Sequence, residues 1–418
     1  MSTDRRAFLL RTAGTLGAGA LIGAGTAEAA RADDAPPPAA LPSTGAAGLD
    51  ARFPFDGPHQ SGILTPQTDA VTHLALDAIA ADRGALIQGL RSLSARAREL
   101  SQGTTAAPDL SDVDAPPADS GTLGVVVAPD ALTVTIAFGA SLFDARYGLR
   151  DRRPAELIAM PAFPDDDLDP ARSHGDVLVT VAANRRDTVV HAVRELLRPV
   201  RDAFALRWTI DGFQSADRAP SPHGARRNLF GFRDGTANPD AKDEGGLVWV
   251  AGRAPEPAWT AGGTYTVLRV IRMHVEFWDR VGLREQENMI GRRRDTGAPM
   301  GGDHERQDPR YDLDPKGDRV PLDAHIRMAN PRTAATRPQR IVRRATNYSR
   351  GFDEAGQLDT GLLFVAHNAS IERQFAKIQA RLAGEPMTDY VTPVGGGYFF
   401  APRGAAGPSD WVGSGLLA

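Results

Sequence analysis

The chain contains, at residues 177–197, the sequence VLVTVAANRRDTVVHAVRELL. Its first seven residues, Val177 to Ala183, are almost all apolar or β-branched, which predicts a strand. From Arg186 to Leu197 the apolar residues recur at helical spacing, on a face formed by Val189, Val190, Val193, Leu196 and Leu197. This spacing predicts an amphipathic helix that directly follows the strand.

The residues on either side of this stretch extend the pattern. An apolar segment at 71–77 precedes a helical stripe within 83–100. Residues 132–138 alternate between large apolar side chains and Thr or Ala, which predicts a half-buried strand. A last strand is expected near 206–210. The order strand, helix, strand, strand, helix, strand is that of a ferredoxin-like fold, in which helices cover one face of an antiparallel sheet.

The second half of the chain repeats this order. We expect a long strand at 264–277, a helix at 284–293 and a buried strand at 362–365. A helical stripe then runs through Ile371, Phe375, Ile378 and Leu382, and a strand follows at 398–400. Residues 294–341 contain six prolines and little periodicity, and long irregular loops in compact domains tend to be functional. We therefore expect the active site there.

Composition excludes several classes of function. The chain has 418 residues, with 48 Lys and Arg against 52 Asp and Glu, a net charge of −4, and no cysteine. This near-balance argues against a basic surface for a nucleic acid. The lack of cysteine excludes disulfides, iron–sulfur clusters and cysteine nucleophiles.

The N-terminus predicts export. Arg5 and Arg6 precede an uncharged run from 12 to 27, and Ala27 and Ala29 supply the small residues that a signal peptidase accepts. The alternative is a membrane anchor, but the run from 12 to 27 is shorter than the roughly 20 apolar residues that a membrane-spanning helix needs. We expect a twin-arginine signal at 1–29, a flexible linker at 30–55, and a mature protein that is periplasmic or extracellular without stable membrane insertion.

Two segments could carry chemistry. One is Asn228 to Pro239, which contains Asp234-Gly235; the other is His325 to Arg332, with Arg343-Arg344 downstream. Composition alone favours a plain turn for the first and a structural histidine for the second. No second histidine follows His304-Glu305 at zinc-protease spacing, and no dinucleotide fingerprint follows a strand.

These segments resemble the dye-decolorising peroxidase family, and within it an exported deferrochelatase/peroxidase branch linked to iron uptake. The matching motifs are GFRDGTANP at 231–239, the run 325–332, GLLF at 361–364, and YV-x-P-x-GGGYFF at 390–400. The resemblance implies an α+β fold with two ferredoxin-like halves of the dimeric α+β barrel type. It divides the chain into an N-terminal domain at 56–220 and a haem-binding domain at 221–415, with one haem b per chain.

The resemblance also implies roles for single residues. His325 matches the proximal iron ligand, Asp234 the distal carboxylate, and Arg343 the distal arginine. The segments that match those lining the haem contain Gly235, Thr236, Ala237, Asn330, Pro331 and Arg332. Because successive strand side chains point to opposite faces, only one of Arg343 and Arg344 can face the iron, and we choose Arg343. We take His367 as structural, and Ala345 stands where some relatives have a distal asparagine.

Three functions remain open at this stage. The first is a peroxidase that uses hydrogen peroxide to oxidise dyes, phenols or similar organic reductants. The second is a deferrochelatase that removes iron from haem and leaves the porphyrin intact, together with iron-uptake components. The third is a non-catalytic haem carrier. The sequence leaves open the oligomeric state, a homo-oligomer included. It also leaves open which aromatic residue relays electrons to a bulky substrate; the candidates are Trp208, Trp249, Tyr265, Trp278, Tyr348 and Trp411.

Overall fold

A computed structural model describes residues 48–105, 114–216, 225–239 and 244–418. The described residues, from 48 onward, belong to one compact unit. Its main sheet has the strand order β7-β11-β4-β5-β1-β6-β9-β10-β8, and an additional pairing joins β7 to β10. Eight strands therefore form a closed ring, from which β8 extends at β10.

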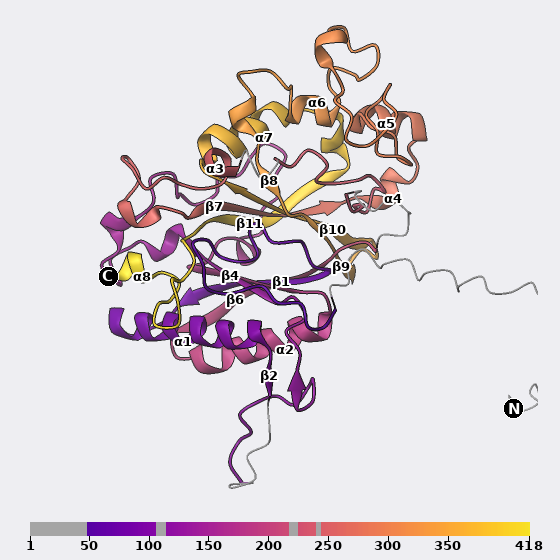
Figure 1. The fold of residues 1–418 in the computed structure, drawn as a ribbon. Helices are drawn as coiled ribbons and strands as arrows, with labels where there is room; N and C mark the ends of the chain where they lie inside the picture. Colours follow the sequence, from indigo (N-terminus) through magenta and orange to yellow (C-terminus); the bar gives the residue numbers. More distant parts are fainter. Residues whose placement is uncertain (1–47, 106–113, 217–224, 240–243) are drawn as a thin grey trace, which may run out of the picture. The chain divides into compact units, whose positions relative to one another are not determined.

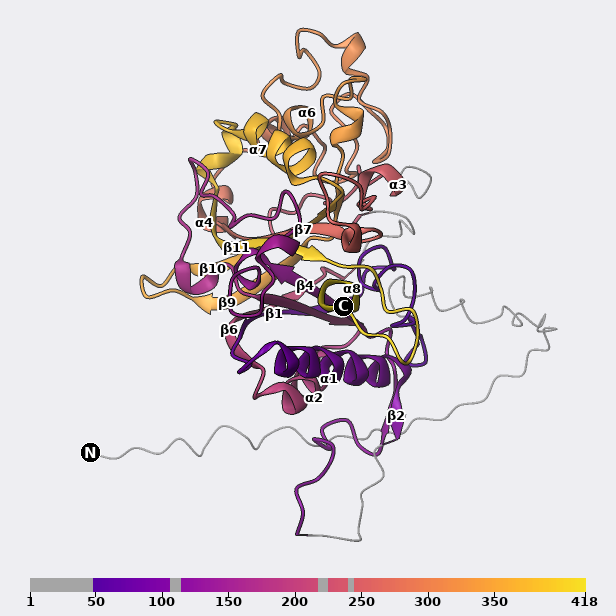
Figure 2. The same cartoon turned by 90° about the vertical axis from the view of Figure 1, so that its left-hand side faces the viewer.

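The N-terminal half of the ring is a ferredoxin-like unit. Its elements are β1 (Ala70–Ala78), α1 (Arg83–Gln102), β4 (Thr133–Gly139), β5 (Val177–Ala183), α2 (Arg186–Leu197) and β6 (Phe204–Phe213). Short strands β2 (Thr104–Thr105) and β3 (Val126–Val127) pair beside it. α1 begins at an Asp82 cap, whose Oδ1 accepts a hydrogen bond from the Ala85 amide. Both α1 and α2 lie on the outer face of this sheet (Figures 1 and 2).

The C-terminal half has the same strand plan, with longer insertions. Its strands are β7 (Thr264–Met273), β8 (Val342–Arg343), β9 (Thr346–Phe352), β10 (Leu358–Asn368) and β11 (Val391–Ala401). Its helices are α3 (Glu244–Leu247), α4 (Val275–Trp278), α5 (Leu283–Ile290), α6 (His325–Ala329) and α7 (Ala376–Leu382), the last preceded by a π-helical turn at Ile371–Phe375. α6 and α7 lie side by side on the outer face of this sheet (Figures 1 and 2).

The two half-sheets meet at both edges. β11 pairs with β4 through Phe399 and Gly139, and β6 pairs with β9 through Phe213 and Asn347. Side chains that alternate along each strand therefore reach two separate apolar layers. Leu74 on β1 packs outward with the helices, whereas Ala75 packs inward between the two sheets.

One glycine is required for the close pairing of β11 with β7. Gly396 has φ +113°, and a Cβ at this position would lie 2.1 Å from the Leu268 carbonyl oxygen. Any larger residue would separate the two strands.

The fold class agrees with the sequence prediction, but several details differ. The strand predicted at 264–277 ends at Met273, because the chain turns there into α4. The helix predicted at 284–293 ends at Ile290, where Gly291 takes a left-handed conformation. β8 and β9 were not expected, since neither shows a clear alternation. The half-buried strand predicted at 132–138 is instead buried on both faces, because the second sheet covers its Thr face.

The predicted linker is shorter than expected. Phe55 is buried in the core, and the carbonyl groups of Leu49 and Ala51 accept hydrogen bonds from the amides of Asp130 and Ala131. The chain is therefore packed on the fold from residue 49 onward. The predicted signal at 1–29, the linker up to 47 and the domain boundary at 220/221 lie outside the described residues.

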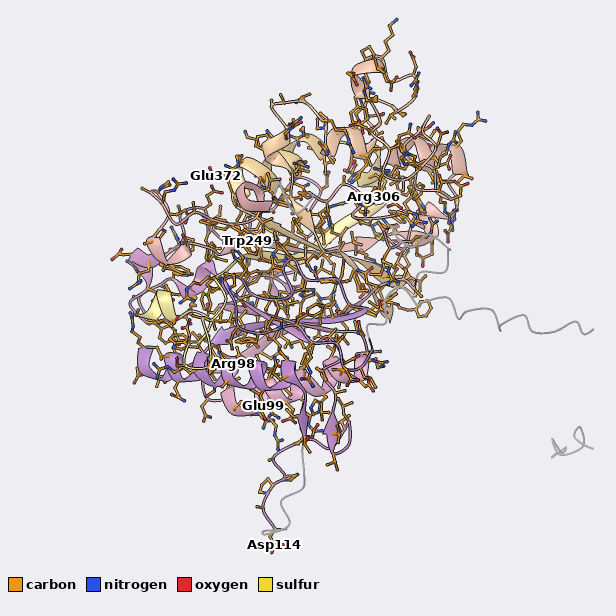
Figure 3. The ribbon with its side chains drawn as sticks, in the orientation of Figure 1. Arg98, Glu99, Asp114, Trp249, Arg306 and Glu372 are labelled. Carbon is orange, nitrogen blue, oxygen red and sulfur yellow. The ribbon has the colours of Figure 1, made fainter. Side chains whose placement is uncertain are left out.

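The C-terminal tail returns to the N-terminal half. Arg98 on α1, labelled in Figure 3, donates to the carbonyl oxygens of Gly407 and Asp410. The Val412 amide donates to Ser94 Oγ, and α8 (Ser414–Leu417) ends the chain beside this half. In the part of the chain that the structure describes, no helix is both long and apolar enough to cross a membrane.

Candidate active site

A cavity of about 270 Å³ lies against the outer face of the C-terminal sheet, under α6 and α7. Apolar side chains form most of its walls: Ile271, Met273, Ile290, Ile326, Ile341, Leu362, Phe364, Phe375, Ile378, Leu382, Met387 and Val391. Three predicted residues line it together, namely Asp234, His325 and Arg343. They come from a loop, a helix and a strand that are far apart in the sequence.

Asp234 is held by a tight hairpin. The Asp234 amide donates to the Arg226 carbonyl at 2.9 Å, and the Asn228 amide donates to the Phe232 carbonyl at 2.9 Å. Gly235 follows with φ +92°, a conformation that an L side chain rarely adopts. The carboxylate is therefore fixed at the start of a turn rather than on a flexible loop.

Asn238 connects this turn to the strand that carries Arg343. Its Nδ2 donates to the Arg343 carbonyl at 2.8 Å, and its Oδ1 accepts from the Arg343 amide at 2.9 Å. The amide side chain thus pairs with Arg343 as a neighbouring strand would. On its other edge, Arg343 pairs with Ala366 of β10.

Asp234 and Arg343 form an ion pair at the cavity wall. Arg343 Nη2 lies 3.0 Å from Asp234 Oδ1, and both side chains are mostly buried. The two atoms are close enough for an ion pair but are not aligned for a hydrogen bond, so Asp234 Oδ1 has no hydrogen-bond partner among the described residues. A buried oxygen of this kind is available to a ligand in the cavity.

His325 begins α6 and is oriented by Glu385. Its Nδ1 lies 2.8 Å from Glu385 Oε2 and 3.0 Å from Oε1, although the two residues are 60 positions apart. Burial lowers the pKa of His325, but the Glu385 carboxylate outweighs this effect and raises the pKa above its usual value. Since Nδ1 is occupied, Nε2 is the ring nitrogen left for the cavity.

Two arginines fix the short helix α6 itself. Arg327 Nη1 lies 3.1 Å from Asp314 Oδ2, and its guanidinium lies over the Tyr311 ring. Arg381 of α7 donates to the carbonyl groups of Met328 and Ala329. The two hydrogen bonds from Arg381 satisfy carbonyls at the C-terminal end of α6, a five-residue helix that would be unstable in isolation.

The other predicted residues take different positions. Thr236, Ala237, Asn330 and Arg332 line the cavity, Gly235 lines a neighbouring polar pocket, and Pro331 lines neither. Arg332 has φ +57°, and its Nη1 lies 3.4 Å from Asp308 Oδ2. It is a partly exposed cation at the cavity.

Arg344 and His367 lie elsewhere. Both line a separate small cavity between the two sheets, on the opposite side of the C-terminal sheet from Asp234. This follows from the alternation of side chains along β8 and β10. Of the six aromatic relay candidates, five are buried, and only Trp249 is half-buried, stacked on the His59 ring.

Sequence reasoning did not identify three residues that organise the site. Glu385 orients His325 and Asn238 positions Arg343. Glu305 binds the turn, because its Oε1 accepts from Thr236 Oγ1 at 2.7 Å and from the Ala225 amide at 3.0 Å. Asn238 lies inside a quoted motif, but nothing in the sequence signals the role of a carboxylate 60 residues from its histidine.

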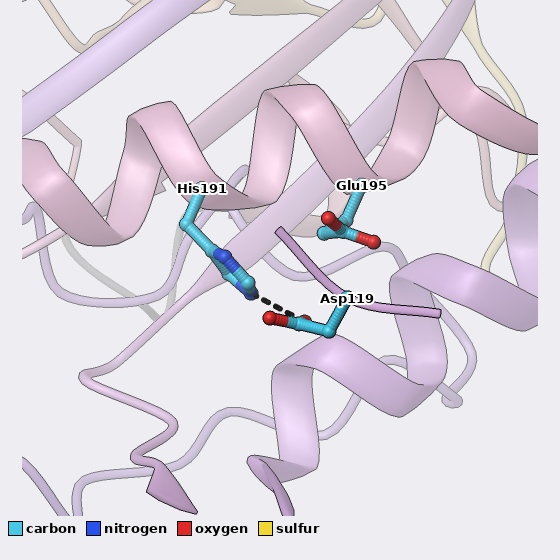
Figure 4. A group of neighbouring side chains, drawn as sticks. All are labelled: Asp119, His191 and Glu195. Carbon is cyan, nitrogen blue, oxygen red and sulfur yellow. Dashed lines mark ion pairs between the residues drawn. The ribbon is translucent and has the colours of Figure 1, made fainter. Parts of the chain in front are cut away.

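A second group of potential metal ligands lies on the N-terminal half (Figure 4). His191 and Glu195 are one turn apart on α2, and Asp119 Oδ2 approaches His191 Nε2 at 3.5 Å. However, Arg96 Nη2 lies 2.7 Å from Glu195 Oε2 and 3.8 Å from Asp119 Oδ2, and Arg198 also reaches Glu195. These guanidinium groups already supply positive charge here, so we assign the cluster to the packing of α1 on α2.

Comparison with known proteins identifies the family. A model described as the N-terminal part of Dyp-type peroxidases matches residues 60–214, and one described as the C-terminal part matches residues 225–406. The chain belongs to the Dyp-type peroxidase family. The family resemblance of its motifs is thereby confirmed.

Individual relatives agree with this membership. The chain is 47% identical over 369 residues to a protein named deferrochelatase from Escherichia coli strain K12, with 87% of each chain covered. A Dyp-type peroxidase structure from Streptomyces coelicolor has a TM-score of 0.80 and 35% identity, covering 90% of this chain and 100% of that one. A second, from Cellulomonas bogoriensis, has a TM-score of 0.78 and 36% identity, covering 89% and 99%.

Dyp-type peroxidases are haem-dependent enzymes, and the cavity of this one suits a haem. Its walls are apolar, as a porphyrin requires. His325 turns a free ring nitrogen toward it, and the carboxylate behind that ring makes the imidazole a better iron ligand. Arg332 at the cavity can form a planar pair with a propionate.

Proposed function

We propose that this protein binds one haem b per chain through His325 and reduces hydrogen peroxide at the expense of an organic reductant. The observation that carries the proposal is the convergence of two pairs on one apolar cavity. His325 is held by Glu385, and Asp234 lies 3.0 Å from Arg343. The first pair supplies an iron ligand and the second supplies a proton acceptor beside a fixed positive charge.

The haem would supply the iron that binds peroxide and stores oxidising equivalents. Asp234 would accept a proton from one peroxide oxygen and return it to the other, which leaves as water. Proton transfer by a positioned carboxylate typically contributes about 10²- to 10⁴-fold to a rate. Overall, H₂O₂ with two electrons from the reductant and two protons gives two molecules of water.

Arg343 would act through its charge. A guanidinium stays protonated and cannot serve as a base. Beside Asp234, it would stabilise negative charge on the departing oxygen. Thr236, Ala237 and Asn330 would contribute to the haem surroundings, with Arg332 on a propionate. Gly235 and Pro331 would shape the backbone beside these residues.

Stopped-flow spectroscopy tests these roles. In Asp234→Asn the reaction of the haem protein with one equivalent of peroxide should slow by about 10²- to 10⁴-fold, with an unchanged Soret band before mixing. His325→Ala should lose the Soret band of the bound haem. Asp312→Asn, at an exposed position, is the control. An Asp234→Asn protein with the wild-type rate would contradict the proton-transfer role.

Deferrochelation is a second candidate, because the Escherichia coli relative carries that name. In this reaction ferrous iron leaves the porphyrin and two protons replace it on the ring nitrogens. Asp234, whose Oδ1 has no hydrogen-bond partner among the described residues, would carry the protons. Fluorescence of free protoporphyrin after anaerobic incubation with reduced haem would support this activity, and haem binding without turnover in either assay would indicate a carrier.

We also propose that residues 1–29 direct export by the twin-arginine route and that the mature protein acts outside the cytoplasm. The paired Arg5 and Arg6 before an apolar run support this. Replacing both by lysine should retain the protein in the cytoplasm on cell fractionation. Export of that variant at the normal level would contradict the proposal.

A further inference from the structure

The second cavity lies inside the ring, between the two half-sheets. Its volume is about 40 Å³, and one water needs roughly 10–15 Å³. Its inward-facing side chains include Thr133, Thr135, Thr180, Thr266 and Thr346. The space therefore suits a few waters or one small inorganic ion, and it is too small for an organic ligand.

Arg344 places a positive charge at this cavity. Its Nη1 donates to the Thr65 carbonyl at 2.5 Å, and no other hydrogen bond of the guanidinium is formed with the described residues. Burial alone lowers the pKa of Arg344 to about 10, so the group remains charged at neutral pH. Among the residues that line the cavity, none is a carboxylate.

Two further basic groups face the same space. His73 and His367 are buried, and their Nδ1 atoms lie 3.0 Å from Thr180 Oγ1 and 3.2 Å from Thr266 Oγ1. Burial, with smaller contributions from Arg344 and His73, lowers the pKa of His367 to about 3. Burial also lowers the pKa of His73 to about 4, although Asp211 opposes this shift. Both histidines are therefore neutral at neutral pH and can offer N–H donors.

One hydroxyl at the cavity has no partner. Thr346 Oγ1 is buried without a hydrogen bond to any described residue. Arg344 is half-buried, and a cation that is partly removed from water without a counter-charge carries a desolvation cost. A buried polar atom without a partner adds to that cost. A single negative ion in the cavity would relieve both.

We propose that the cavity between the sheets is a binding site for a small monovalent anion, such as chloride, held by Arg344. The fixed charge of the guanidinium sets the charge of the ion, and the volume sets its size. Thr346 Oγ1 and the two imidazoles would complete the coordination as hydrogen-bond donors. The site is separate from the proposed peroxide site, because Arg343 and Arg344 project to opposite faces of the sheet.

Thermal unfolding of the mature haem protein tests the proposal. Chloride is exchanged for gluconate at constant ionic strength, since gluconate is too large for the cavity. The midpoint of unfolding should rise by about 2–5 °C as chloride increases to 0.5 M. Arg344→Met should unfold at a midpoint independent of chloride, whereas Arg186→Met, at an exposed arginine, should respond like the wild type.

A flat response of the wild type, or a parallel rise in Arg344→Met, would overturn the proposal. Crystals of the wild-type protein in bromide provide a second measurement that does not depend on a variant. Anomalous scattering should place a bromide beside Arg344 in the cavity. Bromide at surface sites only, with water in the cavity, would likewise overturn it.

Discussion

Glutamine at position 385 would keep the shape of the Glu385 side chain and remove the negative charge that lies 2.8 Å from His325 Nδ1. The amide oxygen can still accept a hydrogen bond from Nδ1–H. The imidazole, however, loses the carboxylate that raises its basicity. If His325 is the iron ligand, the substitution weakens the ligand without removing it.

The expected size of the effect follows from this geometry. A hydrogen bond to a charged group contributes about 1.5–3 kcal/mol. Loss of such a partner behind a metal ligand typically lowers affinity by about 10- to 100-fold, which corresponds to about 1.4–2.7 kcal/mol. Glu385→Gln should lie near the lower end and Glu385→Ala near the upper end. A less basic imidazole also stabilises ferric iron less, so the reduction potential should rise.

Titration of the apoprotein with haem at the Soret band gives the affinity, and spectroelectrochemistry gives the potential. Asp312→Asn removes an exposed carboxylate that pairs with Arg310, and it serves as the matched control. If Glu385→Gln and Glu385→Ala both bind haem with wild-type affinity and potential, the assignment of Glu385 as the partner of an iron ligand is wrong.

Three further outcomes are expected. Asn238→Leu removes both hydrogen bonds to the Arg343 backbone, about 1–3 kcal/mol in total, and should lower kcat/KM for peroxide by about tenfold or more while haem affinity is kept. Burial lowers the pKa of His73 to about 4 and of His367 to about 3, below the value of 6.5 expected in the unfolded chain. Their neutral forms therefore contribute full stability above pH 6.5, and the free energy of unfolding should fall by up to about 1.4 kcal/mol per pH unit and per histidine as pH drops toward 4. Urea titrations should show a shallower fall in His367→Gln; equal slopes would contradict this. Leu90 lies on the buried face of α1, and Leu90→Ala should lower the free energy of unfolding by about 2–5 kcal/mol in the same titrations. A loss below about 1 kcal/mol would show that the core around Leu90 is less tightly packed than described.

The strands and helices of the N-terminal half could be predicted because their periodicity is local. Val177–Ala183 is a strand with the expected bounds, and the helix begins and ends at Arg186 and Leu197 as expected. The Thr face of β4 was misjudged, since the small polar residues Thr133 and Thr135 resemble a solvent-facing edge. Only the pairing of two half-sheets, which no local pattern encodes, shows that this face is interior.

In the candidate site, too, local motifs could be predicted and long-range contacts could not. The motif residues Asp234, His325 and Arg343 were named from the sequence, and the structure brings them to one cavity. Glu385 and Asn238 could not be named, because their roles depend on contacts 60 and 105 residues away. A side chain that bonds a backbone amide or a ring nitrogen leaves no periodic trace in the sequence.

The double junction between the half-sheets has a consequence for how the chain can be divided. If the gene were split between β6 and β7, each fragment would carry two strands with bare hydrogen-bonding edges, β4 and β6 in one and β9 and β11 in the other. Such edges recruit other strands and promote aggregation. The open edges of each fragment pair with those of the other. The two fragments should therefore be insoluble when produced separately and form one soluble complex when produced together.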